Sequence, residues 1–343
     1  MENMDIVNNQ KMLTASRSEK NRVRLSQVRD RICEAGVLVL TAISALIIVF
    51  IFLFILNRAW EIFKVNGLGF ILNKGFDQQL SNAYYASAES PQWIFGALGL
   101  LIGTLTTTLG ALIIAIPMGL GTAIVITELA PSWMKTFLQS VVRLLASIPS
   151  IVFGLLGLMI IVPFILNNFV NVDMQIKYIN FFQLTGHSML AGVIVLSIMI
   201  TPIIIALSVD AINAVPKKFK EASLALGLSH WRTIVKVILP AAKSGIIAGI
   251  ILGTGRAIGE AIALSMVSGG VGNIPNPAHG PVFFLTPVLT LASAIVNKSE
   301  AMSTPTIEAA LFACGVVLLI TSTTLSLLTK IVEIIVKRGE GIE

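Results

Sequence analysis

The chain has 343 residues, of which 55% are hydrophobic and only 12% are charged. A soluble globular domain carries about 25% charged residues, so this composition excludes that class and indicates a chain that crosses a membrane several times. The formal net charge of +6 requires no nucleic-acid partner, because the basic residues gather in segments expected on one side of the membrane. The predicted fold class is all-α, a polytopic membrane protein.

The first 34 residues form a basic segment ahead of the first apolar run. Basic and apolar residues alternate within 1–34, so we expect either a helix along the inner membrane surface or a disordered basic tail. The apolar run 35–56 is longer than the hydrophobic region of a signal peptide and has no small-residue cleavage site after it. We therefore expect it to be retained as the first transmembrane helix.

Five further apolar segments are long enough to cross a bilayer, which takes about 20 residues. Together with the first helix they predict six transmembrane helices. Glycines and prolines interrupt two of these segments, and such breaks are tolerated where protein or a cavity satisfies the freed backbone groups. The five segments are expected near residues 97–127, 140–166, 188–212, 243–268 and 308–332.

The basic residues predict how the spans are oriented in the surrounding membrane lipid. Most of them lie in the N-terminal segment, in the loop after the fourth span, and after the sixth span. Both termini and that loop are therefore expected in the cytoplasm. The resulting organisation has an external segment 57–95, a core 96–335 that contains a second external segment 269–307, and a cytoplasmic tail 336–343.

The cytoplasmic loop 213–240 has a helical pattern of its own. Pro216 can occupy the first turn of a helix that runs to Gly227, a residue type common just after a helix C-terminus. A second short amphipathic segment, 231–239, is expected to end at Pro240. Two short helices joined at a glycine predict a compact knob, either a docking element or an interfacial hairpin without a partner.

The fifth span carries two opposite charges, Arg256 and Glu260, at a spacing that places both side chains on one face of a helix. A charge at bilayer depth normally faces protein or water, because lipid does not solvate it. Arg256 stays protonated and offers a fork of donors suited to phosphate oxygens, and Glu260 is expected to hold that fork when no anion is bound. The pair predicts either the lining of an anion path or a structural salt bridge between helices.

Two hydroxyl side chains are further candidates for the path. Thr107 in the second span can offer its hydroxyl to an ion, although such threonines more often bond the preceding turn of their own helix. Ser150 follows a proline in the third span and can belong to a polar break that faces the path. No catalytic group or metal site is expected, and Cys33 and Cys314 are expected near opposite membrane faces, without a disulfide.

The cytoplasmic loop resembles the E-A-A loop of the membrane subunits of ABC importers. Glu221-Ala222-Ser223, Gly227 and the Val-Ile-Leu-Pro that ends at Pro240 stand at the spacing of that motif, with Ser223 in place of an alanine and the valine in place of an isoleucine. In that family the loop docks into a groove of the ATP-binding subunit. The resemblance therefore implies that Glu221, Ala222, Ser223 and Gly227 are the coupling contacts.

A longer stretch, from about residue 93 to the C-terminus, resembles the phosphate importer permeases of the PstC type. The segments LLASIPSIVFGLLGL, KEASLALGLSHWRTIVKVILP and GRAIGEAIALSMVSGG carry this resemblance. It implies the type I permease fold in a bacterial plasma membrane and inorganic phosphate as the substrate. The implied partners are a PstA-like permease, two PstB-like ATP-binding subunits and an external PstS-like phosphate-binding protein.

The sequence also bears on enzymatic activity and on other functions. It contains no G-x-x-x-x-G-K-[ST] motif, so ATP is expected on a partner, and this chain is expected to be a non-enzymatic subunit without a cofactor. A permease for molybdate or sulfate would share the loop but not the GRAIGE segment, and a PstA-type subunit is a further alternative. An intramembrane enzyme using Glu260 or a histidine lacks the necessary partner groups, and a self-contained channel or secondary transporter would not need a docking knob.

Overall fold

The computed structural model describes residues 2–87, 90–302 and 304–339. Within these ranges the regular elements are helices, and β-structure is limited to one isolated bridge between Gly269 and Val288. The predicted all-α class is confirmed. Of the predicted cytoplasmic tail, residues 340–343 lie outside the described ranges. The chain divides into two compact units, 1–55 and 56–343.

The first unit is the N-terminal part of one long helix, α1 (Glu2–Asn66). The basic segment and the first apolar run are both parts of this helix. The portion that is long and apolar enough to cross a membrane is Cys33–Asn66. Lys64 lies in the last turn, where a cation interacts favourably with the helix dipole.

Six helical stretches in the described ranges have the length and composition of membrane spans, as predicted. Three of them have boundaries that differ clearly from the expected ones: the first ends at Asn66 rather than near residue 56, and the third and fifth differ for reasons given below. The six stretches are Cys33–Asn66, Leu98–Leu129, Ser150–Phe169, Met189–Asn213, His230–Gly259 and Pro305–Ile331.

The third span begins ten residues later than the predicted 140–166. The apolar residues before Pro149 belong to a separate amphipathic helix, α5 (Ser132–Ala146). The amide of Ser147 bonds back to the carbonyl of Leu144, and Pro149 is extended, so the chain turns before α6 (Ser150–Leu156) starts. The span then continues through η2 (Gly157–Ile161) and α7 (Val162–Phe169).

The fifth span begins earlier and ends earlier than the predicted 243–268. Pro240 does not end the preceding helix as expected, because the π-helical turn η3 (Ile234–Ile238) leads directly into α12 (Leu239–Gly259), with the proline in the first turn of α12. At the other end the helix stops at Gly259. The apolar residues that follow form a separate helix, α13 (Ile262–Val267).

Helix α9 (Met189–Asn213) is the most enclosed span of the second unit. In its most apolar stretch 61% of the residues are buried, against 33% or less in the other spans of that unit. The helices α4 (Leu98–Ile124) and α12 pack against it. Glycines permit this close packing, since a Cβ at Gly119 would lie only 2.7 Å from Cγ2 of Ile204.

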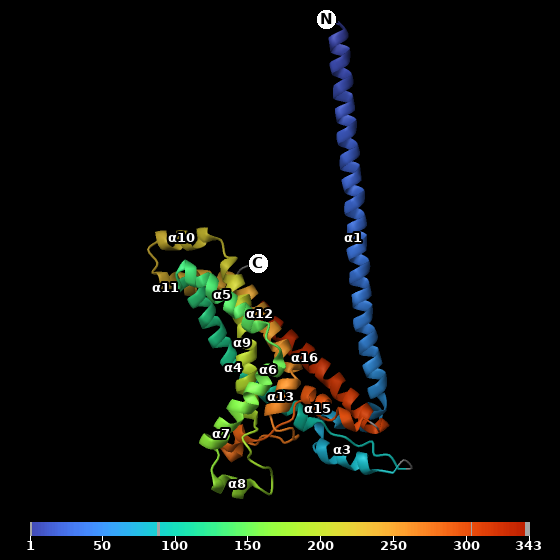
Figure 1. Cartoon of the computed structure of the whole chain (residues 1–343), viewed down its shortest axis with the longest axis vertical. Coiled ribbons are helices and arrows are strands. Elements are labelled where there is room, and N and C mark those ends of the chain that lie inside the picture. Colours follow the sequence, from blue (N-terminus) through green and yellow to red (C-terminus); the bar gives the residue numbers. More distant parts are fainter. Residues whose placement is uncertain (1, 88–89, 303, 340–343) are drawn as a thin grey trace. The chain divides into compact units, whose positions relative to one another are not determined.

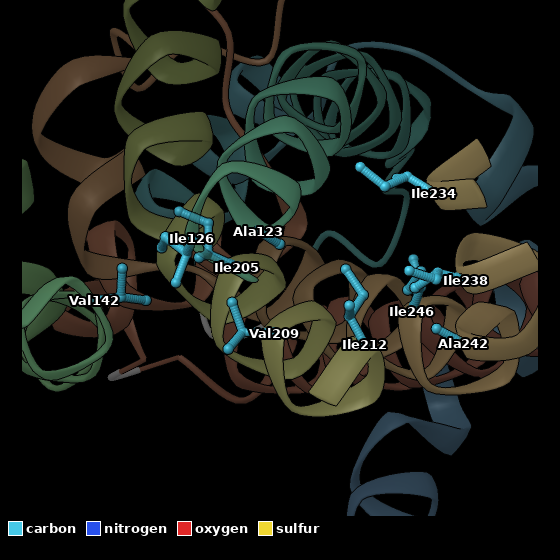
Figure 2. Close-up of a cluster of buried hydrophobic side chains, with 10 residues drawn as sticks. All are labelled: Ala123, Ile126, Val142, Ile205, Val209, Ile212, Ile234, Ile238, Ala242 and Ile246. Atoms are coloured by element: carbon cyan, nitrogen blue, oxygen red, sulfur yellow. The ribbon is translucent and has the colours of Figure 1, made fainter. Parts of the chain in front are cut away.

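One end of the bundle contains a hydrophobic cluster in which six elements meet (Figure 2). The turn η1 (Val125–Leu129) contributes Ile126, and η3 contributes Ile234 and Ile238. These side chains fix the base of the loop between α9 and α12 to the rest of the bundle. The remaining members come from α4, α5, α9 and α12: Ala123, Val142, Ile205, Val209, Ile212, Ala242 and Ile246.

Figure 1 shows that α10 (Lys217–Ala225) and α11 (His230–Thr233) lie at one end of the second unit, with α3 (Phe76–Tyr85), α7 and α8 (Val172–Tyr178) at the other. The last long helix, α16 (Pro305–Gly339), packs against α12 and α15. The shorter elements outside the α9–α12 loop are α2 (Gly69–Leu72), α3 (Phe76–Tyr85), α8 (Val172–Tyr178), η4 (Pro277–His279), α14 (Val282–Leu285), α15 (Leu291–Asn297) and η5 (Ser299–Ala301).

Candidate functional site

The loop between α9 and α12 forms a hairpin of α10 (Lys217–Ala225) and α11 (His230–Thr233). α10 begins directly after Pro216, as predicted. Gly227 has a φ of +83°, in the left-handed region that glycine adopts without strain, and it reverses the chain after α10. The predicted knob of two short helices joined at a glycine is therefore present.

The predicted coupling residues do not all face outward. Glu221, Ala222 and Gly227 are exposed, and the apolar side chain of Leu226 beside them is 84% exposed. Ser223 is only 4% exposed, and its Oγ lies 2.8 Å from Oγ1 of the buried Thr233. Ser223 therefore holds α10 to α11 from inside the hairpin, and its predicted part in coupling stays a prediction.

Arg256 lies in the last turn of α12 and is half-buried. Its Nη1 donates to the carbonyl oxygen of Ala146, the last residue of α5, at 3.4 Å. A cation suits this position, because the carbonyl groups at a helix C-terminus carry partial negative charge. The guanidinium thus connects the end of α12 to the end of α5.

Glu260 is not on the helix that carries Arg256. It follows the last helical residue, Gly259, with extended backbone (φ −71°, ψ 113°), and its side chain is turned to α13. The carboxylate Oε1 accepts a hydrogen bond from the amide of Ala263 at 3.0 Å. The predicted placement of both charges on one helix face, with an ion pair between them, is therefore wrong: the ion pairs in the described ranges do not include Arg256 with Glu260.

Two helix breaks lie next to each other near Arg256: one between α5 and α6, and one between α12 and α13. α13 packs closely on α6, where a Cβ at Gly154 would lie 2.9 Å from Cα of Ala263. Arg256 donates to the carbonyl of the last residue of α5, at the break between α5 and α6. Unwound backbone between membrane helices is tolerated only where protein or water satisfies it, and transporters bind ions at such discontinuous helices. Ser150, half-buried, is the first residue of α6 at this break.

Thr107 is placed differently from these residues. It is fully buried, and its Oγ1 donates to the carbonyl of Gly103 at 2.7 Å, within α4. Its hydroxyl proton is therefore used by its own helix, the alternative that the sequence left open. Thr104, one turn earlier, also accepts from the amide of Leu291 at 2.9 Å and so fixes α4 to the start of α15.

Among the charged pairs that sequence reasoning did not predict, one joins the loop to a membrane span. Nζ of Lys220 in α10 lies 2.5 Å from Oε2 of Glu128 at the end of the second span. The two residues are 92 positions apart, so no local pattern connects them. The signal that could have found Glu128 is a single acidic residue at the end of an otherwise apolar run.

Metal binding has no support in the part of the chain that the structure covers. That part holds no group of three or more His, Cys, Asp or Glu side chains placed to bind a metal ion. Cys33 and Cys314 are both free thiols, the first exposed and the second buried.

Comparison with known proteins gives one family. Residues 115–337 match the family model described as "Binding-protein-dependent transport system inner membrane component". The chain is 37% identical over 291 residues to the "Probable ABC transporter permease protein YqgH" of Bacillus subtilis (strain 168), which covers 83% of this chain and 86% of that protein. It is 32% identical over 296 residues to the "Phosphate transport system permease protein PstC" of Pasteurella multocida (strain Pm70), covering 82% and 85%. A protein of the same name from Haemophilus influenzae (strain ATCC 51907 / DSM 11121 / KW20 / Rd) is 29% identical over 342 residues, covering 96% and 100%.

Proposed function

The chain belongs to the family of binding-protein-dependent transport system inner membrane components, and we propose that it is the PstC-type permease subunit of an ATP-driven importer of inorganic phosphate. The observation that supports phosphate as the substrate is the similarity, over more than four-fifths of the chain, to proteins named phosphate transport system permease. The chain is a multi-pass inner membrane protein with the fold of an ABC importer permease. In the proposed orientation both termini and the α10–α11 hairpin lie in the cytoplasm.

The proposed phosphate path runs beside the two adjacent helix breaks. Arg256 offers five N–H donors, and the one hydrogen bond that the described ranges give it, to Ala146, leaves a fork free for phosphate oxygens. Glu260 holds the start of α13 beside it and reduces the local positive charge, which keeps the anion from binding too tightly to leave. Ser150 contributes a hydroxyl at the same break, and Thr107 supports the path from within α4.

The proposed coupling element is the hairpin. Its exposed residues Glu221, Ala222 and Gly227, with the apolar side chains of Leu226 and Trp231, form a surface for a groove on an ATP-binding subunit. ATP is bound and hydrolysed by that partner, and this chain holds no cofactor and catalyses no reaction. The proposed complex contains a PstA-like second permease, two PstB-like ATP-binding subunits and a PstS-like external binding protein.

The experiment is uptake by the complete complex in lipid vesicles that contain ATP, with the binding protein outside. We expect radiolabelled phosphate to accumulate only when both ATP and the binding protein are present. An excess of unlabelled molybdate or sulfate should leave the rate unchanged. Uptake of labelled molybdate or sulfate in place of phosphate would reassign the substrate, and uptake without any ATP-binding subunit would reject the importer itself.

A further inference from the structure

The docking helix α10 is joined to the second span by an ion pair whose carboxylate is nearly buried. Nζ of Lys220 lies 2.5 Å from Oε2 of Glu128, and the side chains are 35% and 9% exposed. Glu128 belongs to η1 (Val125–Leu129), the π-helical turn that follows α4. Separating the pair is unfavourable chiefly for Glu128, because its nearly buried carboxylate would be left without a compensating charge.

The same helix is joined to the fifth span by a second polar contact. Ser223 of α10 bonds to Thr233, and both side chains are buried. Thr233 directly precedes η3, the π-helical turn that leads into α12, the helix that carries Arg256. α10 is therefore fastened to two membrane helices, each time at a π-turn, a feature that often marks functional positions in helices.

The two contacts differ in their surroundings. A cavity of about 340 Å³ lies between α10 and the end of the second span. Its wall includes Glu128 and Lys135 on one side and Lys217, Lys220 and Glu221 on the other. Packing is therefore incomplete on this side of α10, and both partners of the ion pair lie on the wall of the cavity.

We propose that Lys220 and Glu128 form a positioning link that makes α10 and η1 move as one body, so that movement of the docked hairpin is transmitted to α4. This inference rests on the proposed function, since it assumes that α10 receives the movement of an ATP-binding subunit. The Ser223–Thr233 contact transmits the same movement to α12. Two of the helices around the proposed path are then moved together.

Charge reversal in the complete complex tests the link. We expect Glu128→Lys and Lys220→Glu each to lower phosphate uptake by about tenfold or more while ATP hydrolysis continues, because each places two like charges in contact. The double variant, with the charges exchanged, should recover uptake to within about threefold of wild type. Single variants with wild-type uptake, or a double variant no better than the singles, would overturn the link.

The matched control is Arg143→Glu. Arg143 forms a second ion pair at this end of the bundle, with Asp210 at 3.5 Å, but the side chains are 67% and 58% exposed. An exposed pair contributes little, so we expect uptake within about threefold of wild type. A loss as large as that of the Lys220 variant would mean that any charge reversal at this end impairs the complex, which would also count against a specific link.

A spin-label distance measurement tests the same link with a readout other than phosphate uptake. Labels at Leu129→Cys and Lys218→Cys, both exposed positions, are placed in a Cys33→Ser, Cys314→Ala background. We expect one narrow distance distribution in the nucleotide-free and the ATP-bound complex, and a broader one after Glu128→Gln. A distance that changes between the two nucleotide states in the presence of the ion pair would reject the inference. If wild-type vesicles took up no phosphate, the proposed substrate would fail, whereas this measurement would still decide on the link.

Discussion

The guanidinium of Arg256 lies 3.4 Å from the carbonyl oxygen of Ala146, so a charge in the last turn of α12 contacts the end of α5, the helix that precedes the third span. This contact brings together two places where the backbone leaves the helical conformation. Arg256 is only half-buried there, with donors beyond the one that Ala146 uses. The arrangement allows the side chain to bind an anion without first breaking an ion pair with Glu260.

Replacing Arg256 by glutamine should remove transport without removing the complex. Glutamine cannot supply the charge or the fork, and a hydrogen bond to a charged group contributes about 1.5–3 kcal/mol, so we expect phosphate uptake to fall by about tenfold or more. Co-purification of all subunits and ATP hydrolysis should persist. Undiminished uptake by Arg256→Gln in vesicles would remove Arg256 from the path.

Two substitutions of Glu260 should separate its capping role from its charge. Glu260→Ala removes the acceptor for the amide of Ala263, and loss of such a cap costs about 1 kcal/mol. Glu260→Gln keeps an acceptor oxygen, so we expect a thermal midpoint of the purified complex closer to wild type. If both variants had the same thermal midpoint as wild type, the contact to Ala263 would not stabilise the protein. A change of uptake in Glu260→Gln alone would measure the contribution of the charge.

The Ser223–Thr233 contact should stabilise the hairpin locally. Ser223→Ala leaves the buried hydroxyl of Thr233 without this partner, which costs about 1–3 kcal/mol. We expect faster hydrogen exchange of the α10 amides in this variant. In the Ser223→Ala, Thr233→Ala double variant the effect should be smaller than the sum of the two single effects, because the contact can be lost only once. Strictly additive effects would show that the two hydroxyls act independently.

The close approach of α6 and α13 should depend on Gly154. A Cβ there would lie 2.9 Å from both Cα of Ala263 and Sδ of Met266, so Gly154→Ala must separate the helices and cost about 1–3 kcal/mol. The thermal midpoint and phosphate uptake should both decrease. Gly121→Ala is the control, since a Cβ at that helical glycine meets nothing within 4 Å. Equal behaviour of the two variants would exclude a packing requirement at Gly154.

The sequence was sufficient for the number of spans and for the shape of the hairpin. Long apolar runs and the positions of Pro216 and Gly227 are local signals, and local geometry determined those elements. The interruption at Glu260 could not be read in this way, because the apolar pattern continues through the break into α13. There the backbone conformation depends on a side chain that caps the following helix, which hydrophobicity does not record.

The charged pairing was misassigned for the same reason. A spacing of four residues predicts a contact only if the helix continues, and it ends at Gly259. The partner of Glu128 lies in a loop far along the sequence, and the partner of Arg256 is a backbone carbonyl, a group that every residue has. Neither contact leaves a pattern in residue types. The inward orientation of Ser223 likewise depends on how α10 lies against α11.

The enclosure of α9 has a consequence for the biogenesis of the protein. Its neighbour α12 is synthesised after it. α9 therefore leaves the ribosome before one of the two helices that enclose it exists. Its almost uninterrupted apolar sequence lets it enter the lipid before α12 is present, in keeping with a process in which insertion precedes helix association. The most enclosed span of the finished bundle must therefore be stable in the bilayer before its packing partner α12 has been inserted.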